Sequence, residues 1–323
     1  MILHLEQDIF KDAITATAQH LSIREVYIEK DYWVTWILKN LAQSDFKNET
    51  IFKGGTSLSK AFGCIDRFSE DIDLAIITNN RTNNQIKRLI TTIQKHITKD
   101  LEEINIEGIT SKGSKFRKTV HQYHKVSENI LFGQASDKLL VEINAFAIPH
   151  PNEARKIETY IAQFLRETNN EKIISQYQLE TIEVLCLNIE RTFTEKIMGL
   201  IRASYYDNPI NELKQKIRHI YDIERMLSIE NIKVFLASEA FFEMLEKVKH
   251  DDASNHEFGG DWLTKKWHQC ILFSNIVNTW QKLKHTYLNE FATLVYGDLP
   301  DSEEIITTLQ IISERLRIFD KQK

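Results

Sequence analysis

The segment FKGGTSLSKAFGCIDRFSEDIDLAII, residues 52–77, combines residue types that could handle a phosphate and a metal ion. Gly54 and Gly55 lack a Cβ atom, so a phosphate could approach their backbone, and a helix predicted just after them would direct its free N–H groups there. Asp71 and Asp73 are two residues apart on a predicted strand, so both carboxylates lie on one face. Such carboxylates repel each other unless a cation such as Mg²⁺ binds them.

A third acid, Glu142, lies within the apolar stretch LLVEINAF. A glutamate in a buried strand is rare unless it is paired with a cation or binds a metal. Together with Asp71 and Asp73 it would suit two-metal nucleotidyl transfer, in which one ion activates a hydroxyl and the other holds the phosphates. The structural alternatives are a solvated strand end for the two aspartates and a buried ion pair for Glu142.

The composition fits a helix-rich protein with reduced thiols. The chain has 323 residues, enough for two domains, and its 10 glycines and 4 prolines argue against long unstructured linkers. The net charge of −5 means that a nucleic acid would need a local basic patch. The three cysteines form no CxxC pair, and no segment fits a signal peptide or a membrane span. We therefore expect a cytoplasmic protein.

The first part of the chain alternates helical and strand patterns. A helix is expected over residues 5–20, and Ser22 and Glu25 form a predicted capping box that opens a second helix through about Leu41. The elements predicted next are a strand at 51–53, a Gly-Gly turn, a helix at 57–62, a strand at 71–77, a helix at 82–103 and strands within 106–148.

Beyond Pro149 and Pro151 the spacing of apolar residues is helical. The predicted helices lie at 156–167, 179–203, 210–228 and 231–248. The layout predicts an α+β fold, with an α/β domain and its N-terminal helices at residues 1–160 and a helical domain at residues 161–323.

The segment KGGTSLSKAFGCIDRFSEDIDL resembles the signature of the AbiEii/AbiGii-type nucleotidyltransferases, which belong to the DNA polymerase-β-like superfamily. Members are toxins of type IV toxin–antitoxin and phage-abortive-infection systems. The chain supplies the glycine turn, the run Arg67-Phe68-Ser69-Glu70-Asp71 and Asp73, while Glu142 matches the third acid. The stretches IEKDYWVTWIL, EKIMGLIR and RHIYDIERML are similar to other family motifs, so that the resemblance covers about residues 20–230.

The resemblance implies a polymerase-β-like nucleotidyltransferase domain with a mixed sheet, followed by a helical C-terminal domain. It implies transfer of a nucleoside monophosphate from an NTP to an acceptor hydroxyl, with two Mg²⁺ ions. The implied catalytic residues are Asp71, Asp73, Glu142 and Lys196, of which the three acids bind metal. The implied nucleotide-binding residues are Gly54, Gly55, Thr56, Ser57, Lys60, Arg202, Arg218 and Asp222.

Several of these residues also have an ordinary structural interpretation. Lys196 could be a solvated helix lysine, and Asp222 could form an intrahelical pair with Arg218 or His219. His219 stands where many relatives carry aspartate.

The family relationship also implies partners. NTP is the substrate, with GTP and an RNA or tRNA acceptor end as the candidates, and an antitoxin would be encoded nearby. No membrane partner is expected. Two alternatives remain open, namely a nucleotidyltransferase acting on a small antibiotic-like compound and a catalytically silent NTP-binding protein.

Three further segments have competing interpretations. Residues 111–125 are basic and include Phe116 and Tyr123, so they could contact RNA and stack a base, or they could form a solvated edge strand. Residues 250–262 contain acids and histidines, including His256, but their polar composition favours a surface loop over a metal site. The tryptophans at 262, 267 and 280 are expected in the core or at a docking surface.

Overall fold

The computed structural model describes residues 1–69, 71–127, 138–254 and 258–322. These residues form two compact units. The first comprises Met1–Gly63 and Phe68–Leu187, and the second comprises Cys64–Arg67 and Asn188–Lys323. The segment Cys64–Arg67 therefore belongs to the second unit, although its sequence neighbours on both sides belong to the first.

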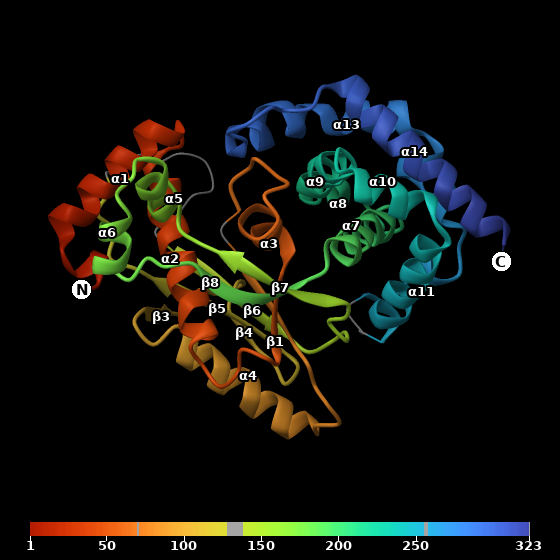
Figure 1. Cartoon of the computed structure of the whole chain (residues 1–323). Helices are drawn as coiled ribbons and strands as arrows, with labels where there is room; N and C mark the ends of the chain where they lie inside the picture. The colour runs from red at the N-terminus through yellow and green to blue at the C-terminus, as the bar shows by residue number, and fades with distance from the viewer. Residues whose placement is uncertain (70, 128–137, 255–257, 323) are drawn as a thin grey trace. The chain divides into compact units, whose positions relative to one another are not determined.

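The first unit contains a mixed sheet (Figure 1). Its described strands follow the order β3-β5-β6-β2-β1-β8-β7, and β4 pairs with β5. β2 runs parallel to β6 and β1 parallel to β8, whereas the other pairs are antiparallel. The strands are β1 (Thr50–Lys53), β2 (Ile72–Ile76), β3 (Glu102–Ile104), β4 (Ser111–Lys112), β5 (Phe116–Gln122), β6 (Lys138–Asn144), β7 (Asn152–Ile157) and β8 (Ile182–Leu187). The predicted α+β class with a mixed sheet is confirmed.

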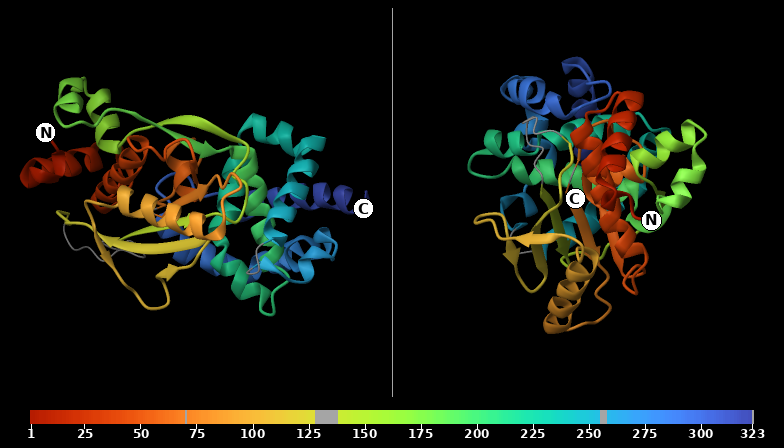
Figure 2. Two further views of the ribbon diagram at one scale, coloured as in Figure 1. Left: turned by 90° about the horizontal axis from the view of Figure 1, so that it is seen from below. Right: turned by 90° about the vertical axis from the view of Figure 1, so that its left-hand side faces the viewer.

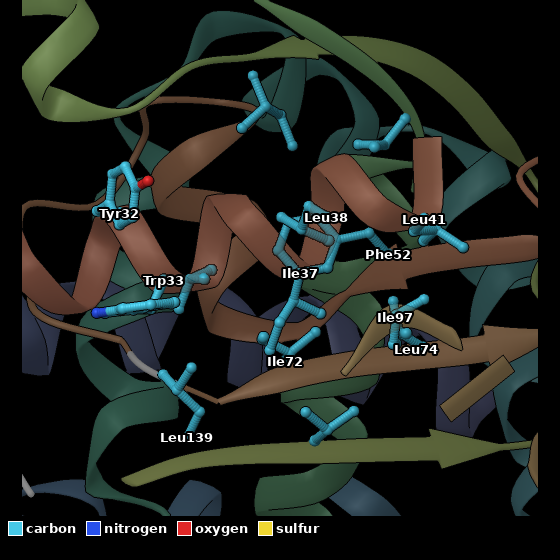
Figure 3. Packing of buried hydrophobic residues seen from close by; sticks show 14 of the residues in the cluster. Tyr32, Trp33, Ile37, Leu38, Leu41, Phe52, Ile72, Leu74, Ile97 and Leu139 are labelled. Atoms are coloured by element: carbon cyan, nitrogen blue, oxygen red, sulfur yellow. The ribbon is translucent and has the colours of Figure 1, made fainter. Parts of the chain in front are cut away.

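Helix α2 (Glu25–Ala42) supplies much of the core of this unit. Its Ile37 and Leu38 are fully buried in one hydrophobic cluster with Phe52 of β1 and Leu74 of β2 (Figure 3). The other helices of the unit are α1 (Gln7–Leu21), α3 (Gly54–Lys60), α4 (Asn83–Ile97), α5 (Tyr160–Glu167), α6 (Glu171–Gln176) and the 3₁₀ helix η1 (Leu3–Leu5).

The predicted capping box before α2 is wrong. Ser22 has a φ of 55° and a left-handed conformation, and its N–H donates to the carbonyl of Ala18 as the C-terminal cap of α1. The residue that precedes α2 is Arg24, which makes no side-chain capping bond. Ser22 ends the first helix, so it is not available to begin the second.

The expectation that the strands end at the two prolines is also wrong. The chain continues into β7, and the predicted helix over 179–203 divides into β8 and α7 (Ile189–Ala203). Val184, Cys186 and Leu187 of β8 are buried, because this strand lies between β1 and β7. The compact unit that holds the sheet therefore extends to Leu187, beyond the expected domain boundary at residue 160.

The second unit is helical in its described residues (Figure 2). Trp262, Trp267 and Trp280 are all nearly inaccessible to solvent, which confirms their expected place in a core. Besides α7 it contains α8 (Pro209–Gln215), α9 (Ile217–Leu227), α10 (Glu230–Ala237), α11 (Glu239–Ala253), α12 (Ile271–Ser274), α13 (Ile276–His285), α14 (Ser302–Lys321), the 3₁₀ helices η3 (Asp261–Leu263), η4 (Trp267–Gln269) and η6 (Ala292–Leu294), and the π-helix η5 (Thr286–Phe291).

Among the described helices, none combines the length and the apolar character needed to cross a bilayer.

The burial of α2 leads to a stability prediction. Replacing Ile37, which is 0% exposed, with alanine should lower the free energy of unfolding by about 2–5 kcal/mol, because the lost contacts leave a cavity. The matched control is Ile9→Ala on α1, where the side chain is 45% exposed and the change should stay within about 0.5 kcal/mol. Urea unfolding measures both values. Equal losses in the two variants would contradict the described packing.

Candidate functional site

The two glycines of the signature segment open helix α3 directly after β1. The helix begins at Gly54, earlier than the expected start at Ser57, and it ends at Lys60. Gly54 has a φ of +79°, and a Cβ atom at this position would lie 2.1 Å from Oδ2 of Asp73. Only glycine fits this conformation and this close approach. The glycine bend and the Asp73 carboxylate are therefore in direct contact.

The hydroxyl residues that follow the glycines are held within the protein. Thr56 Oγ1 donates to the Asp71 carbonyl oxygen at 2.5 Å and is hydrogen-bonded to Ser69 Oγ at 3.0 Å. Ser57 Oγ donates to the Gly54 carbonyl oxygen at 3.0 Å. Both hydroxyl residues are buried. In this arrangement they fix the backbone around the glycines and the first aspartate, and Glu70 of the same motif lies outside the described residues.

The pairing of β2 brings two of the three predicted acids together. Asp73 is opposite Glu142 in the parallel β2–β6 ladder and opposite Lys53 in the antiparallel β1–β2 ladder. Lys118 of β5 is opposite Glu142 in turn. Residues directly opposite each other across strands share one face of the sheet. Lys53, Asp73, Glu142 and Lys118 thus form one line across four strands, which we call the charged row.

Asp71 lies immediately before β2 and not within the strand as predicted. Ile72 and Leu74 are fully buried, whereas Asp71 and Asp73 are partly exposed, in agreement with the predicted alternation. The expectation that Glu142 is buried needs correction, because its side chain is 27% exposed. The alternation of β6 turns Glu142 away from the core, where Val141 and Ile143 lie.

The environment of Glu142 shifts the pKa of its carboxyl group. Burial raises the pKa of Glu142 above its usual value. The charges of Lys118 and Lys53 oppose this rise in pKa, and the charge of Asp71 adds to it. Asp71 is therefore electrostatically coupled to the charged row.

The donor set has the chemistry that a hard divalent cation requires. Asp71, Asp73 and Glu142 offer carboxylate oxygens, the preferred ligands of Mg²⁺, and the absent side chain of Gly54 lets the Asp73 carboxylate lie against the backbone. Within the described part of the chain, however, no three acidic, histidine or cysteine side chains converge closely enough to hold a metal ion. Metal binding would require these carboxylates to turn toward a common point.

The basic stretch at 111–125 does not form one exposed surface. Lys112 pairs with Glu103 at 2.6 Å. Arg117 is buried and donates to Gln94 at 2.9 Å. Tyr123, expected to stack a base, is 4% exposed and stacks on Trp33, and Phe116 stacks on Phe146. The alternative of a solvated edge strand is also wrong for β5, because β6 lies on one side and β3 and β4 on the other.

In the second unit a buried aspartate forms ion pairs with two basic side chains. Asp222 of α9 is 0% exposed, and it accepts from Arg67 Nε at 2.6 Å and Nη2 at 2.8 Å. Lys196 Nζ of α7 lies 2.7 Å from Asp222 Oδ2, so this lysine is not a solvated helix residue. Burial alone would raise the pKa of Asp222, but the charges of Arg67 and Lys196 and their hydrogen bonds hold it well below its usual range.

Arg67 is the residue of this cluster that sequence reasoning missed. It belongs to the recognised motif and lies four residues before Asp71, and this membership was the sequence feature that could have identified it. An intrahelical pair of Asp222 with Arg218 or His219 is one of the interpretations that the sequence leaves open, and the structure shows Asp222 bound to Arg67 and Lys196. Desolvation, together with the charges of Lys196 and Lys216, holds the pKa of His219 well below its usual value, so its imidazole is neutral at pH 7.

The segment around Arg67 is fixed to the helical unit by further bonds. The Asp66 carbonyl oxygen accepts from the N–H groups of Tyr296 and Gly297. Its carboxylate pairs with Arg225 at 3.1 Å. Arg67 also forms an isolated bridge with Val295. The position of the Arg67 guanidinium is therefore set by the surrounding helices.

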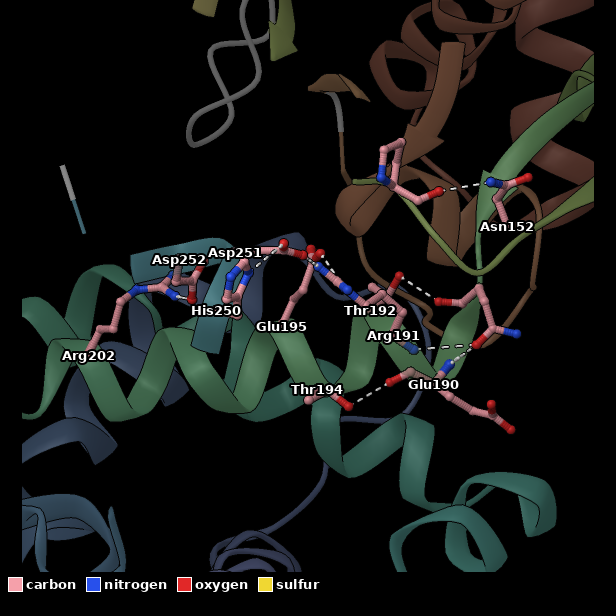
Figure 4. A network of polar contacts seen from close by, with 12 residues as sticks. Asn152, Glu190, Arg191, Thr192, Thr194, Glu195, Arg202, His250, Asp251 and Asp252 are labelled. Carbon is pink, nitrogen blue, oxygen red and sulfur yellow. Dashed lines mark hydrogen bonds and ion pairs between the residues drawn. The ribbon is translucent and has the colours of Figure 1, made fainter. Parts of the chain in front are cut away.

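Two predicted nucleotide-binding cations are engaged in other ion pairs. Lys60 pairs with the buried Asp31 and donates to the Glu158 carbonyl oxygen at 3.1 Å. Arg202 of α7 pairs with Asp252 and lies over the Phe258 ring at 4.2 Å (Figure 4). These pairs account for both side chains without a ligand.

The segment at 250–262 is not a loop throughout. Asp251 and Asp252 lie in the last turn of α11, where Asp251 pairs with Arg191 of α7 at 2.5 Å (Figure 4). The carboxylates therefore join α11 to α7, and His256 lies outside the described residues.

Comparison with known proteins adds a family match. The sequence profile of the AbiEii family, described as nucleotidyl transferase AbiEii toxin of a Type IV TA system, matches residues 36–286. Among solved structures, the chain is similar to MenT4, the nucleotidyltransferase toxin Rv2826c from Mycobacterium tuberculosis H37Rv. The sequence identity is 14% and the TM-score 0.48, over 93% of this chain and 98% of that chain. No curated protein matches the chain.

The buried cluster leads to a second stability prediction. Asp222→Asn should lower the free energy of unfolding by about 3–5 kcal/mol, because Arg67 and Lys196 would remain buried without a negative partner. The control is Asp207→Asn at an exposed position of the same unit, with little expected effect.

The pH dependence of stability tests the same cluster. The folded-state pKa of Asp222 is lower than the unfolded value of 3.8. The ionised carboxylate therefore contributes its full stabilisation well above pH 3.8, and this stabilisation is lost as the pH falls below that value. The difference in unfolding free energy between wild type and Asp222→Asn should therefore narrow in acid. A difference that stays constant from neutral to acidic pH would contradict an ionised, paired Asp222.

Proposed function

This chain belongs to the AbiEii family of nucleotidyltransferase toxins of type IV toxin–antitoxin systems, and we propose that it moves a nucleoside monophosphate from an NTP to an acceptor hydroxyl at the charged row. In this reaction the acceptor oxygen attacks the α-phosphorus, the bond to the β-phosphate oxygen breaks, and pyrophosphate leaves. The hydroxyl proton passes to one of the carboxylates.

The observation that carries the proposal is the alignment of Asp73 with Glu142 next to Gly54. Two carboxylates opposite each other on neighbouring strands repel, and the glycine beside them has no side chain, which lets the Asp73 carboxylate approach the backbone at the start of α3. A site with these properties suits a bound cation and an incoming phosphate.

We propose that Asp71, Asp73 and Glu142 hold two Mg²⁺ ions. When bound, such ions activate the acceptor hydroxyl and neutralise the charge that develops on the phosphates. Gly54 and Gly55 would admit the triphosphate to the backbone of α3.

The remaining residues would act by binding and orientation. Thr56 and Ser57 would keep the α3 backbone in place through the hydrogen bonds described above. The family relationship implies Lys196 as a further catalytic residue, and Asp222 would hold its ammonium in a fixed, charged state. We treat Lys60 and Arg202 as residues that support the surrounding structure, and Arg218 remains a candidate for nucleotide binding.

The finer assignments follow from the family relationship. We propose GTP as a candidate nucleotide, the end of a tRNA or another RNA as the acceptor, a cytoplasmic location and an antitoxin as the cellular partner. Lys115 and Lys125 of the basic stretch are the candidates for contact with an RNA backbone.

The test uses purified protein with each α-labelled NTP, Mg²⁺ and total RNA, and the products are resolved by size. Label in RNA supports the proposed acceptor, and label only in an added small hydroxylated compound would replace it with the antibiotic-type reaction. NTP binding without any labelled product would indicate a silent binding protein.

Asp73→Asn should reduce labelling by roughly 1,000-fold, because it removes a carboxylate that acts on the transition state. Its unfolding midpoint should not fall, since the substitution relieves repulsion from Glu142. The control is Asp12→Asn, at an exposed position of α1, which should retain wild-type labelling. Full activity of folded Asp73→Asn would refute the proposed site.

A further inference from the structure

We propose that Lys118 is the resident counterion of Glu142 and competes with a divalent cation for this carboxylate. The inference rests on the proposed function in taking Glu142 as a metal ligand. It assigns a role to a strand residue that lies outside the signature motifs of the family.

The geometry places Lys118 at the end of the charged row. Lys118 of β5 is directly opposite Glu142 of β6, and its Nζ lies 3.7 Å from Glu142 Oε2. Both side chains are partly exposed, at 30% and 27%, so the ammonium can move into solvent without crossing the core. The separation exceeds that of a direct hydrogen bond, which makes this an ion pair that a stronger cation can displace.

Neighbouring cations on the same strands are engaged differently. Lys112 pairs with Glu103, and the Arg117 guanidinium is bonded to Gln94 in the interior. Neither Glu103 nor Gln94 belongs to the charged row. Lys118 therefore differs from Lys112 and Arg117 in its position and in its partner.

The charge balance explains what this ion pair would do. In the absence of metal, Lys118 offsets the repulsion between Glu142 and Asp73. A divalent cation that binds Glu142 is repelled by the ammonium and must displace it. If the cation arrives with a triphosphate, the displaced ammonium gains an anionic partner. Lys118 thus disfavours metal binding alone and favours joint binding of metal and NTP.

The experiment measures binding of Mn²⁺ to the full-length protein by electron paramagnetic resonance, first without nucleotide and then with a non-hydrolysable NTP. Lys118→Met should bind Mn²⁺ alone about fivefold more tightly than wild type, because the competing charge is gone. The enhancement of Mn²⁺ binding by nucleotide should fall by a similar factor. Lys118→Arg should restore wild-type behaviour in both measurements.

Lys112→Met is the matched control, since it removes a lysine from a lysine–glutamate pair outside the charged row, and its Mn²⁺ affinity should equal that of wild type. Thermal unfolding verifies that each variant is folded. The inference would be overturned if Lys118→Met bound Mn²⁺ no more tightly than wild type. It would also be overturned if Lys112→Met gained as much Mn²⁺ affinity as Lys118→Met.

A double variant separates failure of this inference from failure of the proposed function. Adding Asp73→Asn to Lys118→Met should abolish the gain in Mn²⁺ affinity if the ion binds at the charged row. A gain that survives in the double variant means that Mn²⁺ binds elsewhere, which overturns both proposals. No gain in Lys118→Met, combined with loss of labelling in Asp73→Asn, overturns only the role of Lys118.

Discussion

The pairing of β2 with β1 on one side and β6 on the other is the constraint on which the candidate site depends. It places Asp73 opposite both Lys53 and Glu142. A slip of one residue would turn the acid to the opposite face and expose Ile72 and Leu74, which are fully buried. The burial of two apolar side chains thus determines where the carboxylates lie. Burial of apolar side chains on one face of the sheet stabilises this register and offsets the repulsion between the carboxylates on the other face.

The second unit contains a buried carboxylate that is stabilised by cationic side chains. Asp222 is wholly buried, and a charge in that position persists only with close partners, which Arg67 and Lys196 provide. The arrangement keeps Lys196 paired and oriented within a helical core. It also gives the segment Cys64–Arg67 a fixed place among the helices, although the chain on both sides of it belongs to the first unit.

The sequence was sufficient for features that depend on local pattern. Alternation predicted that Asp71 and Asp73 face away from Ile72 and Leu74, and the buried tryptophans were expected, whereas the mixed sheet was implied by the family resemblance. What it could not supply were contacts between distant segments. Arg67 and Asp222 are 155 residues apart, and the alignment of Lys118 with Glu142 depends on strand register. The strand β8 was taken for helix because a short apolar run fits either periodicity.

The charged row is better explained by function than by stability. Opposite charges or apolar residues at the Asp73–Glu142 position would stabilise the ladder, whereas like charges weaken it. Desolvation and then the charge of Asp71 raise the pKa of Glu142, and the charges of the flanking Lys118 and Lys53 oppose this rise. Gly54 adopts its left-handed φ without strain, and any larger residue there would clash with the same aspartate. The like charges at one place, in a sheet that is otherwise regularly paired, are the local exception that the proposed nucleotide site would account for.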